Sequence, residues 1–167
     1  MIQKAWFLKP RWKKEGLILD AGCGPGFAAI YLNELGYNVV ALDLISEFLS
    51  FYNINEINPI AADMCFLPFQ PNTFDAIISI SALQWIYREL NNESMQLNLI
   101  SLSISIEKLL KPKSRAIFQY YPKNNLIMEA IGKIIAENTN LNGSFIVDNP
   151  NNAKKRKIFL LLTKEFY

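Results

Sequence analysis

A glycine-rich segment near the start of the sequence carries its clearest chemical signal. Gly22, Gly24 and Gly26 follow a short apolar run and stand directly before another one. Glycine lets a backbone turn sharply and lets a ligand approach the main chain closely. The first N–H groups of a following helix are free to meet that ligand. The pattern predicts a small-molecule site at a strand-to-helix turn, and a tight turn that binds nothing is the alternative.

The spacing of these glycines and the acid before them indicate which ligand is bound. The spacing is G-x-G-x-G, and Phe27 stands where the dinucleotide pattern G-x-G-x-x-G needs its third glycine, which disfavours nicotinamide-dependent reduction. Asp20 precedes the glycines, where a carboxylate suits an ammonium group and not a pyrophosphate. We therefore predict S-adenosylmethionine as the cofactor, with its amino-acid end beside Asp20.

Two further acids end the next two apolar runs. Asp43 comes 23 positions after Asp20, at the place where a carboxylate accepts hydrogen bonds from both ribose hydroxyls. Asp63 is expected to take the adenine amino group while the backbone N–H of Met64 meets a ring nitrogen. A single acid of this kind is more often a solvated loop carboxylate, but three in register fit an adenosine. The predicted cofactor contacts are Asp20, Gly22, Cys23, Gly24, Gly26, Asp43, Leu44, Asp63, Met64 and Ser79.

The segment 79–85 is expected to line the space beside the donor methyl group. It lacks the N/D-P-P-Y/F pattern that places an exocyclic amine. Gln84 is suited to orient the edge of a base, and Trp85 is suited to stack on one. For Trp85 and for the two tyrosines at the end of the fifth predicted strand, a core or lid position is the structural alternative. The substrate-pocket candidates are Ser81, Gln84, Trp85, Tyr120 and Tyr121.

Other chemistries are excluded by what the sequence lacks. It contains no histidine, so serine–histidine and cysteine–histidine mechanisms are ruled out. Its two cysteines, Cys23 and Cys65, cannot close a zinc site of the usual kind, and no metal is predicted. In an intracellular chain they are expected to be free thiols.

Alternating strands and helices must position these residues. Strands are predicted over 17–19, 39–42, 59–62, 74–80 and 116–120, with a final pair over 145–147 and 158–162. Helices are predicted over 27–35, from a Ser46 cap to about Tyr52, from an Asn92 cap to the stop at Lys111-Pro112, and over roughly 125–139. The third of these helices carries an apolar stripe made of Met95, Leu99, Leu102, Ile106 and Leu109.

This order of elements defines the fold class. Strands separated by helices predict an α/β fold with a parallel sheet and helices on both faces. The last two strands are joined by too few residues for a parallel crossover, so they are expected to form an antiparallel hairpin. The 167 residues, 51% of them apolar and 19% charged, fit one domain over 1–167. No apolar run approaches the length of a membrane span, and the first residues resemble no cleaved signal, so an intracellular location is expected.

Basic residues gather at both ends of the sequence. Residues 1–16 and 151–167 each hold five lysines or arginines against one glutamate, although the net charge of the chain is +2. If the strand before the hairpin is parallel to its predecessors, the hairpin loop turns at the ligand edge. The run Lys154, Lys155, Arg156 and Lys157 then suits a phosphate backbone. Solubilising charge, or lysines that protect a sheet edge, is the alternative.

Several segments give the sequence a family resemblance. It resembles the guanine-N7 methyltransferases of small-subunit ribosomal RNA, found in eukaryotes with archaeal relatives, and looks like a minimal or archaeal-type member. The matching segments are LDAGCGPG (19–26), ALDL (41–44), ADM (62–64), LPFQPNTFDAIISISALQW (67–85), LLKPKSRAIFQYYPKN (109–124) and VDNPNNAKKRKIFLLL (147–162). The fourth and sixth are more specific than the glycine loop, which all such methyltransferases share.

The resemblance implies a Rossmann-like, mostly parallel seven-stranded sheet with one antiparallel strand. It also implies cofactor contacts at Asp20, Gly22, Gly24, Asp43, Asp63 and Met64. It further implies a partner, a small zinc-binding methyltransferase activator that would pair with the edge strand 59–62. The apolar flank of that strand is formed by Phe48, Leu49, Phe51 and Tyr52. Ribosomal RNA is the implied substrate, in the cytoplasm or, in a eukaryote, the nucleus.

The chemistry that follows is direct methyl transfer to a nitrogen that carries no proton. Such a reaction needs no general base, so a chain without histidine can perform it, and alignment of the reactants is expected to supply most of the catalysis. Two rival functions share the same predicted site. One is methylation of a small molecule, and the other is a non-catalytic ribosome assembly factor that binds RNA without turnover.

Overall fold

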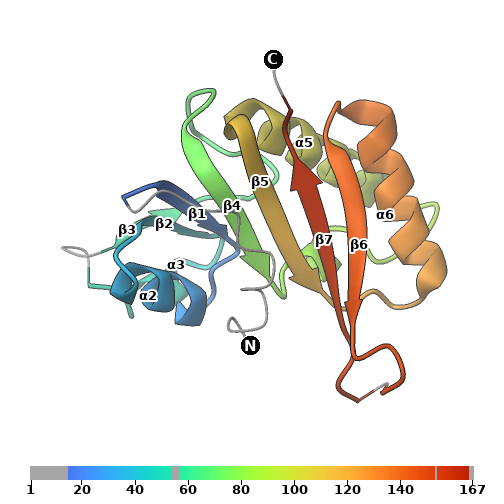
Figure 1. Ribbon diagram of the computed structural model, residues 1–167, viewed down its shortest axis with the longest axis horizontal. Coiled ribbons are helices and arrows are strands. Elements are labelled where there is room, and N and C mark those ends of the chain that lie inside the picture. The colour runs from blue at the N-terminus through green and yellow to red at the C-terminus, as the bar shows by residue number, and fades with distance from the viewer. Residues whose placement is uncertain (1–14, 54–56, 153, 166–167) are drawn as a thin grey trace.

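The computed structural model describes residues 15–53, 57–152 and 154–165. A seven-stranded sheet with the order β3-β2-β1-β4-β5-β7-β6 forms its centre (Figure 1). The basic segment predicted over 1–16 lies almost wholly outside the described residues. The strands are β1 (Leu17–Ala21), β2 (Asn38–Asp43), β3 (Asn58–Ala61), β4 (Phe74–Ile80), β5 (Leu110–Tyr120), β6 (Asn142–Asp148) and β7 (Lys157–Thr163).

The direction of each strand decides which loops meet. β1 to β5 run parallel to their neighbours, while β7 is antiparallel to both β5 and β6. β6 therefore runs in the same direction as β5. The predicted hairpin and the single antiparallel strand are confirmed, and the loop between β6 and β7 lies at the edge where the other strands have their carboxyl ends.

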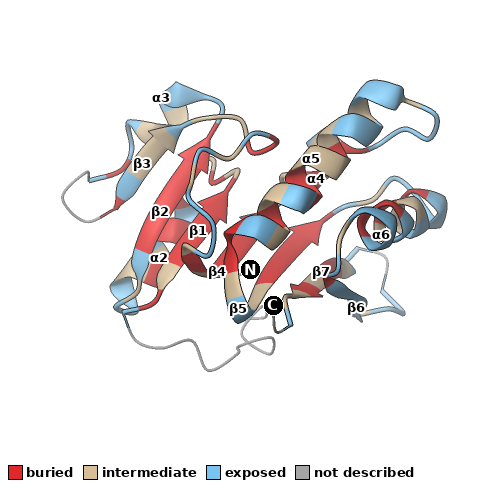
Figure 2. Ribbon diagram, turned by 90° about the horizontal axis from the view of Figure 1, so that it is seen from above, coloured by how far each residue is buried: buried red, intermediate tan, exposed pale blue. Residues whose placement is uncertain are grey.

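Helices cover both faces of the sheet, as the sequence predicts (Figures 1 and 2). α2 packs on one face against Ile18, Val39 and Ala76, which belong to one buried cluster. The longer α5 and α6 pack on the other face over a second, larger cluster. The helices are α2 (Phe27–Glu34), α3 (Ser46–Leu49), α4 (Leu83–Ile86), α5 (Glu93–Leu109) and α6 (Asn125–Asn138).

The long helix α5 begins and faces the core as its sequence predicts. Asn92 is its N-cap, and the side-chain oxygen accepts a hydrogen bond of 3.1 Å from the N–H of Met95. Four members of the predicted apolar stripe are buried, and Met95 is half-buried. Among the described residues, none of the helices combines the length and the apolar character that crossing a bilayer requires.

Two local predictions are wrong. Ser46 is not a cap: α3 begins at Ser46 itself, the residue before it is Ile45, whose side chain has no hydrogen-bond acceptor, and the helix ends at Leu49. β5 begins six residues earlier than predicted, at Leu110. Pro112 lies in this added stretch, where the pairing of β4 with β5 shifts register, which is how a strand accommodates a residue without an N–H.

Candidate cofactor and acceptor site

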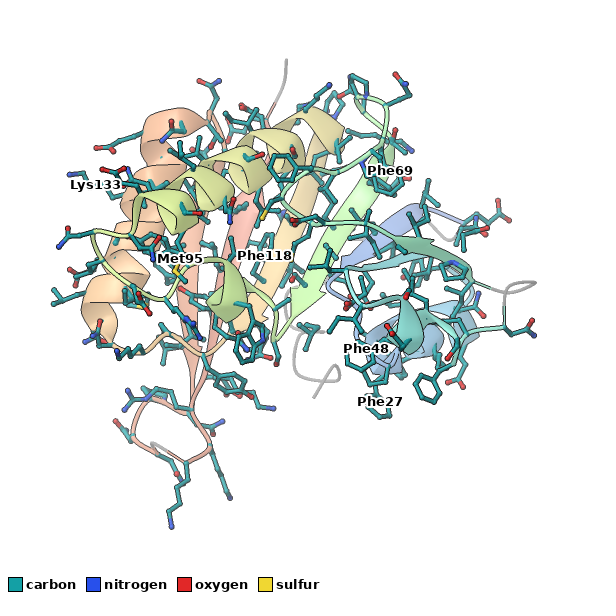
Figure 3. All side chains as sticks on the ribbon, turned by 180° about the vertical axis from the view of Figure 1, so that it is seen from behind. Phe27, Phe48, Phe69, Met95, Phe118 and Lys133 are labelled. Carbon is teal, nitrogen blue, oxygen red and sulfur yellow. The ribbon has the colours of Figure 1, made fainter. Side chains whose placement is uncertain are left out.

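A cavity of about 870 Å³ opens at the carboxyl edge of the sheet. It is formed by the β1–α2 loop, the ends of β2 and β4, the residues that follow β3, and one side of α2. Phe27 and Phe48, which belong to α2 and α3, both line it and lie close to each other in Figure 3. This is the place in an open parallel sheet where ligands bind.

The glycine turn is fixed by the neighbouring strand. The N–H groups of Gly22 and Cys23 both donate to the carbonyl of Leu42, at 2.8 and 3.0 Å. Gly22 has a φ of +74°, and a Cβ added there would lie 2.5 Å from the Cβ of Ala82. Gly22 is therefore required both by the backbone conformation and by the close approach of the chain that follows β4.

Gly26 has a different role from the other glycines. It has a φ of +95°, stands at the N-terminus of α2, and does not line the cavity. An added Cβ would lie 2.6 Å from the ring of the buried Tyr52. Its function in the structure is to let the turn pack on that ring.

Asp20 is a buried acid without a partner. Its side chain is 1% exposed, and among the described residues neither carboxylate oxygen makes a hydrogen bond. Burial raises the pKa of Asp20 to about 7. The backbone N–H of Ala29, which lies near the carboxylate without forming a hydrogen bond to it, lowers the pKa in part, and the neighbouring Asp43 adds to the rise. An acid that lines a cavity with both oxygens unpartnered fits a ligand that brings hydrogen-bond donors and positive charge, as the ammonium group of S-adenosylmethionine does.

Asp43 connects the glycine turn to the end of β2. One of its oxygens accepts a hydrogen bond of 2.8 Å from the N–H of Gly24, and the other accepts one of 2.9 Å from the N–H of Ile45. Because each carboxylate oxygen has two lone pairs, both oxygens can still accept a ribose hydroxyl. The next residue, Leu44, is 69% exposed and lines the cavity beside it.

Asp63 and Met64 follow β3 on the same side of the cavity. One oxygen of Asp63 accepts a hydrogen bond of 2.8 Å from the N–H of Cys65, which fixes the turn. Met64 is buried, and its sulfur would lie 3.5 Å from a Cβ added at Gly22. The predicted cofactor contacts that line the cavity are Asp20, Gly22, Cys23, Gly24, Asp43, Leu44, Asp63 and Met64, whereas Gly26 and Ser79 do not line it.

Only some of the substrate-pocket candidates line the cavity. Ser81 and Trp85 line the cavity, and the Trp85 side chain is 68% exposed. Gln84 does not line it and instead donates to the carbonyl of Ser81. Tyr120 is fully buried in the core on the α5 and α6 face, and Tyr121 is 47% exposed outside the cavity.

Apolar residues complete the cavity. Ile80 and Ala82 line it from the segment 79–85, which the sequence predicts to lie there, and Ile86 lines it just beyond that segment. Phe27 and Tyr31 line it from α2, and their spacing of four residues could have indicated a shared helix face.

Both cysteines are buried free thiols. Burial raises the pKa of Cys23 and of Cys65 to about 12, so both are neutral thiols near pH 7 and poor nucleophiles. No group of ligands suited to a metal ion is found within the described part of the chain.

The fold and the site together define the class of protein. A sheet with a single reversed strand, a glycine turn after β1, and acids after β1, β2 and β3 are the features of the class I S-adenosylmethionine-dependent methyltransferases. Residues 19–118 match the family described as "Methyltransferase domain", and the chain belongs to that family.

Two of the sequence relatives are named for a specific methylation reaction. The chain is 35% identical to the 18S rRNA (guanine-N(7))-methyltransferase of Bos taurus over 149 residues, which cover 87% of this chain and 53% of that protein. It is 33% identical to the 18S rRNA (guanine-N(7))-methyltransferase RID2 of Arabidopsis thaliana, again over 87% of this chain and 52% of the relative. The chain thus spans about half the length of these relatives.

Solved structures confirm the fold. A SAM-dependent methyltransferase from Methanosarcina mazei superposes with a TM-score of 0.74 at 13% identity, covering 93% of this chain and 95% of that one. The PH0226 protein of Pyrococcus horikoshii superposes with a TM-score of 0.75 at 15% identity, covering 98% and 90%.

Proposed function

We propose that this chain transfers the methyl group of S-adenosylmethionine to N7 of a guanine in small-subunit ribosomal RNA. The observation that carries the choice of substrate is the identity of up to 35%, over nearly the whole chain, with methyltransferases named for that reaction. The described residues supply a cofactor cavity of the matching class.

The proposed cofactor contacts follow from the donors and acceptors in the cavity. Bound S-adenosylmethionine supplies an electrophilic methyl group. Asp20 is suited to its ammonium group, Asp43 to its ribose hydroxyls, and Asp63 with the N–H of Met64 to its adenine. The backbone of the glycine turn, including Cys23, lines the cavity and is suited to pack against the part of the cofactor that joins its ammonium group to its ribose.

The chain needs no acid or base for this reaction. Guanine N7 carries no proton, and its lone pair is free to attack. The residues around the cavity contribute by holding the reactants aligned, which supplies roughly 7–11 kcal/mol in favourable cases. The buried Asp20, the neutral thiols and the lack of histidine are all compatible with a reaction in which no side chain transfers a proton.

The β6–β7 loop is the proposed RNA contact. Lys154, Lys155 and Arg156 are exposed there, and Lys157 begins β7. The loop extends beyond the sheet in Figure 1. Because β6 is parallel to β5, the loop lies on the same edge as the cavity, where its charge can meet the phosphates on either side of a bound nucleotide.

The edge of β3 is the proposed site for a small zinc-binding activator protein. Within the part of the chain that the structure describes, β3 pairs only with β2 and is the outermost strand of the sheet. Ala62 donates to the carbonyl of Asp43, so the alternation of a strand turns the N–H of Ala61 outward, where an added strand can accept it. Phe51, 68% exposed, lies close by in the sequence. A cytoplasmic or nuclear location follows from the ribosomal substrate.

The test is methylation of ribosomal subunits in vitro. The chain, alone and co-expressed with an activator of this type, is incubated with small subunits from cells that lack its gene and with tritiated S-adenosylmethionine. We expect tritium in the RNA and chain cleavage at one 7-methylguanine after reduction and aniline treatment. Asp43→Ala is the inactive control. RNA binding without methyl transfer would favour an assembly factor, and transfer to small molecules alone would contradict the proposal.

A further inference from the structure

The end of β5 lies between the cavity and the β6–β7 loop. Ser81, which lines the cavity, donates its N–H to the carbonyl of Gln119 in β5 at 2.8 Å. On the other side Tyr120 pairs with Ile158 of β7, so the next step of the antiparallel ladder brings Tyr121 level with the residue at which the loop ends. Neighbouring strands are about 4.8 Å apart. A polymer that runs from the cavity to the loop therefore passes the residues that follow β5.

Tyr121 presents an aromatic side chain on this path. The alternation of the strand turns Tyr120 into the core, at 0% exposure, and leaves Tyr121 47% exposed. The helix α4 packs beside β5, and its Trp85, 68% exposed, lines the cavity. Exposed aromatic rings, one inside the cavity and one just outside it, are the kind of surface on which the bases of a single-stranded nucleic acid stack.

The cations near Tyr121 are not neutralised. Lys123 is exposed two residues after it, and Lys154 and Lys155 are exposed in the β6–β7 loop. Within the described part of the chain none of these three lysines forms an ion pair. Residues 149–156 contain no acid. Their charge is therefore available to a phosphate backbone.

The β6–β7 loop is held in shape by its own hydrogen bonds. The N–H of Asn152 donates to the carbonyl of Asn149 at 3.1 Å, and the N–H of Lys155 donates to the carbonyl of Asn152 at 3.0 Å. The guanidinium of Arg156 donates to the carbonyl of Pro150 at 3.3 Å. Because the loop already has a fixed form, less ordering of its backbone opposes binding.

Charge decides the direction in which a bound RNA leaves the cavity. On the cofactor side, the rim carries the carboxylates of Asp43 and Asp63, which repel a phosphate backbone. In the segment after α4, Arg88 lies 3.8 Å from Glu89, so its charge is offset. The residues that follow β5 lead instead to exposed lysines without an acidic partner.

We propose that Tyr121 stacks on a nucleotide next to the modified guanine and that Lys123 binds a phosphate beside it, so that the RNA runs as a single strand from the cavity to the β6–β7 loop. The inference rests on the proposed function and adds to it the form of the RNA and two contacts with it. A paired flank would not serve, because the bases of a duplex stack on each other and leave no face free for Tyr121.

The experiment measures RNA binding by the chain in complex with its activator. The probe is a fluorescent single strand that carries the guanine located in the subunit assay and its flanking nucleotides, and fluorescence anisotropy gives the affinity. Tyr121→Ala and Tyr121→Leu should weaken binding roughly 5- to 100-fold, the value of one base on an aromatic ring. Tyr121→Phe should bind as the unmodified chain does, because it keeps the ring.

Lys123→Ala should reduce the slope of log affinity against log salt by about 0.7, the value of one phosphate contact in a single strand. Affinity for S-adenosylmethionine should not change in the variants of Tyr121 or Lys123, since neither residue lines the cavity. Leu97→Ala and Lys133→Ala are the matched controls. They remove exposed side chains from α5 and α6 and should leave RNA binding unchanged.

RNAs with an abasic site separate stacking from a structural role of Tyr121. The base is removed in turn from each nucleotide near the guanine. At one position this removal should weaken binding by the unmodified chain about as much as Tyr121→Ala does, and it should have little further effect on Tyr121→Ala. Annealing strands that pair the flanks and leave the guanine unpaired should weaken binding in the same way.

The outcomes distinguish the inference from the function beneath it. Absence of 7-methylguanine in the subunit assay would overturn both. Methyl transfer combined with equal RNA affinity of Tyr121→Ala and the unmodified chain would overturn the inference alone. So would equal binding of RNAs with paired and unpaired flanks, or a loss in Tyr121→Phe as large as that in Tyr121→Ala. An abasic position that is coupled to Tyr121 is the result that supports it.

Discussion

The two halves of the sheet present different chemistry at the same edge. The half formed by β1 to β3 ends in three carboxylates, of which Asp43 and Asp63 are fixed by backbone N–H groups and Asp20 is buried without a partner. The half formed by β4 to β7 offers the neutral Ser81, the exposed Trp85 and a basic loop. The first half is suited to one small cationic ligand. The second is suited to a large polyanion whose charges lie on a phosphate backbone.

Removing Asp43 should weaken cofactor binding more than any other change considered for this half of the sheet. Asp43→Ala deletes the acceptor of the Gly24 and Ile45 N–H groups as well as the expected ribose contacts. Each hydrogen bond to a charged group contributes about 1.5–3 kcal/mol, so we expect affinity for S-adenosylmethionine to fall about 100-fold or more. Isothermal titration calorimetry measures it. Asp75→Ala, which removes an acid bonded to Lys111 and Leu17 outside the cavity, should lower stability and leave that affinity nearly unchanged.

The contact between the two halves is tested at Gly22. Gly22→Ala places a Cβ against Ala82 in a left-handed conformation, so we expect affinity for the cofactor to fall roughly 10- to 100-fold and the melting temperature to drop. Gly24→Ala has a similar φ of +53° but no atom within 4 Å of its added Cβ. The loss of cofactor affinity expected for Gly24→Ala is smaller, and the difference between the two variants measures the effect of the contact with Ala82. Equal losses in the two variants would show that conformation alone matters.

Asp20 should make cofactor binding depend on pH. The free chain holds this acid with a pKa of about 7, and the ionised form is the one that pairs with an ammonium group. Affinity for S-adenosylmethionine should therefore rise about tenfold between about pH 6 and pH 8. Asp20→Asn should bind more weakly at pH 8 and lose this dependence, which calorimetry at several pH values detects.

Because of Asp20, the stability of the cofactor-free chain should fall as the pH rises, whereas the affinity for the cofactor should increase. Its pKa is about 7 in the folded chain and 3.8 in the unfolded one, so the folded state binds more protons between these values. Stability without cofactor is then greatest below about pH 4 with respect to this group, and it is lost as the pH rises through about 7. Asp20→Asn should melt at a higher temperature than the unmodified chain at pH 8. A lower melting temperature would contradict the burial of an ionised acid.

The smallest expected effect lies in the acceptor half. The double variant Lys154→Ala/Lys155→Ala should weaken RNA binding several-fold at low salt and reduce the slope of log affinity against log salt by up to about two. Binding of S-adenosylmethionine should not change. Lys108→Ala/Lys133→Ala removes the same charge from exposed positions on α5 and α6, so it is the matched control. Equal effects of the two double variants would remove the β6–β7 loop from the RNA contact.

How far the sequence predicts the structure also differs between the halves. Every predicted strand exists, and the acids and most glycines of the cofactor half lie together, because few residue types can make such a turn and strand ends are easily located. In the acceptor half, side-chain direction decides the outcome. Tyr120 faces the core while Tyr121 is exposed, an alternation of one residue that a strand boundary known to within a few residues cannot resolve.

Hydrogen bonds between residues far apart in the sequence are a second reason why the acceptor half is hard to predict. The hydroxyl of Ser81 donates to the side-chain oxygen of Gln119, 38 positions away, and the left-handed conformation of Ser81 follows from no local pattern. A glutamine within the mainly apolar run 116–120 was the only trace of it in the sequence.

The place of β7 between β5 and β6 has a consequence for biosynthesis. The strand that joins the two is the last of the seven to leave the ribosome, so β6 emerges before it has any neighbour to pair with. Until then the growing polypeptide carries β5 as an open edge, and unpaired strand edges are the kind of surface on which nascent chains associate. The β6–β7 hairpin therefore docks as a final unit, and it brings its lysines to the rim of the sheet only when translation of the domain is nearly complete.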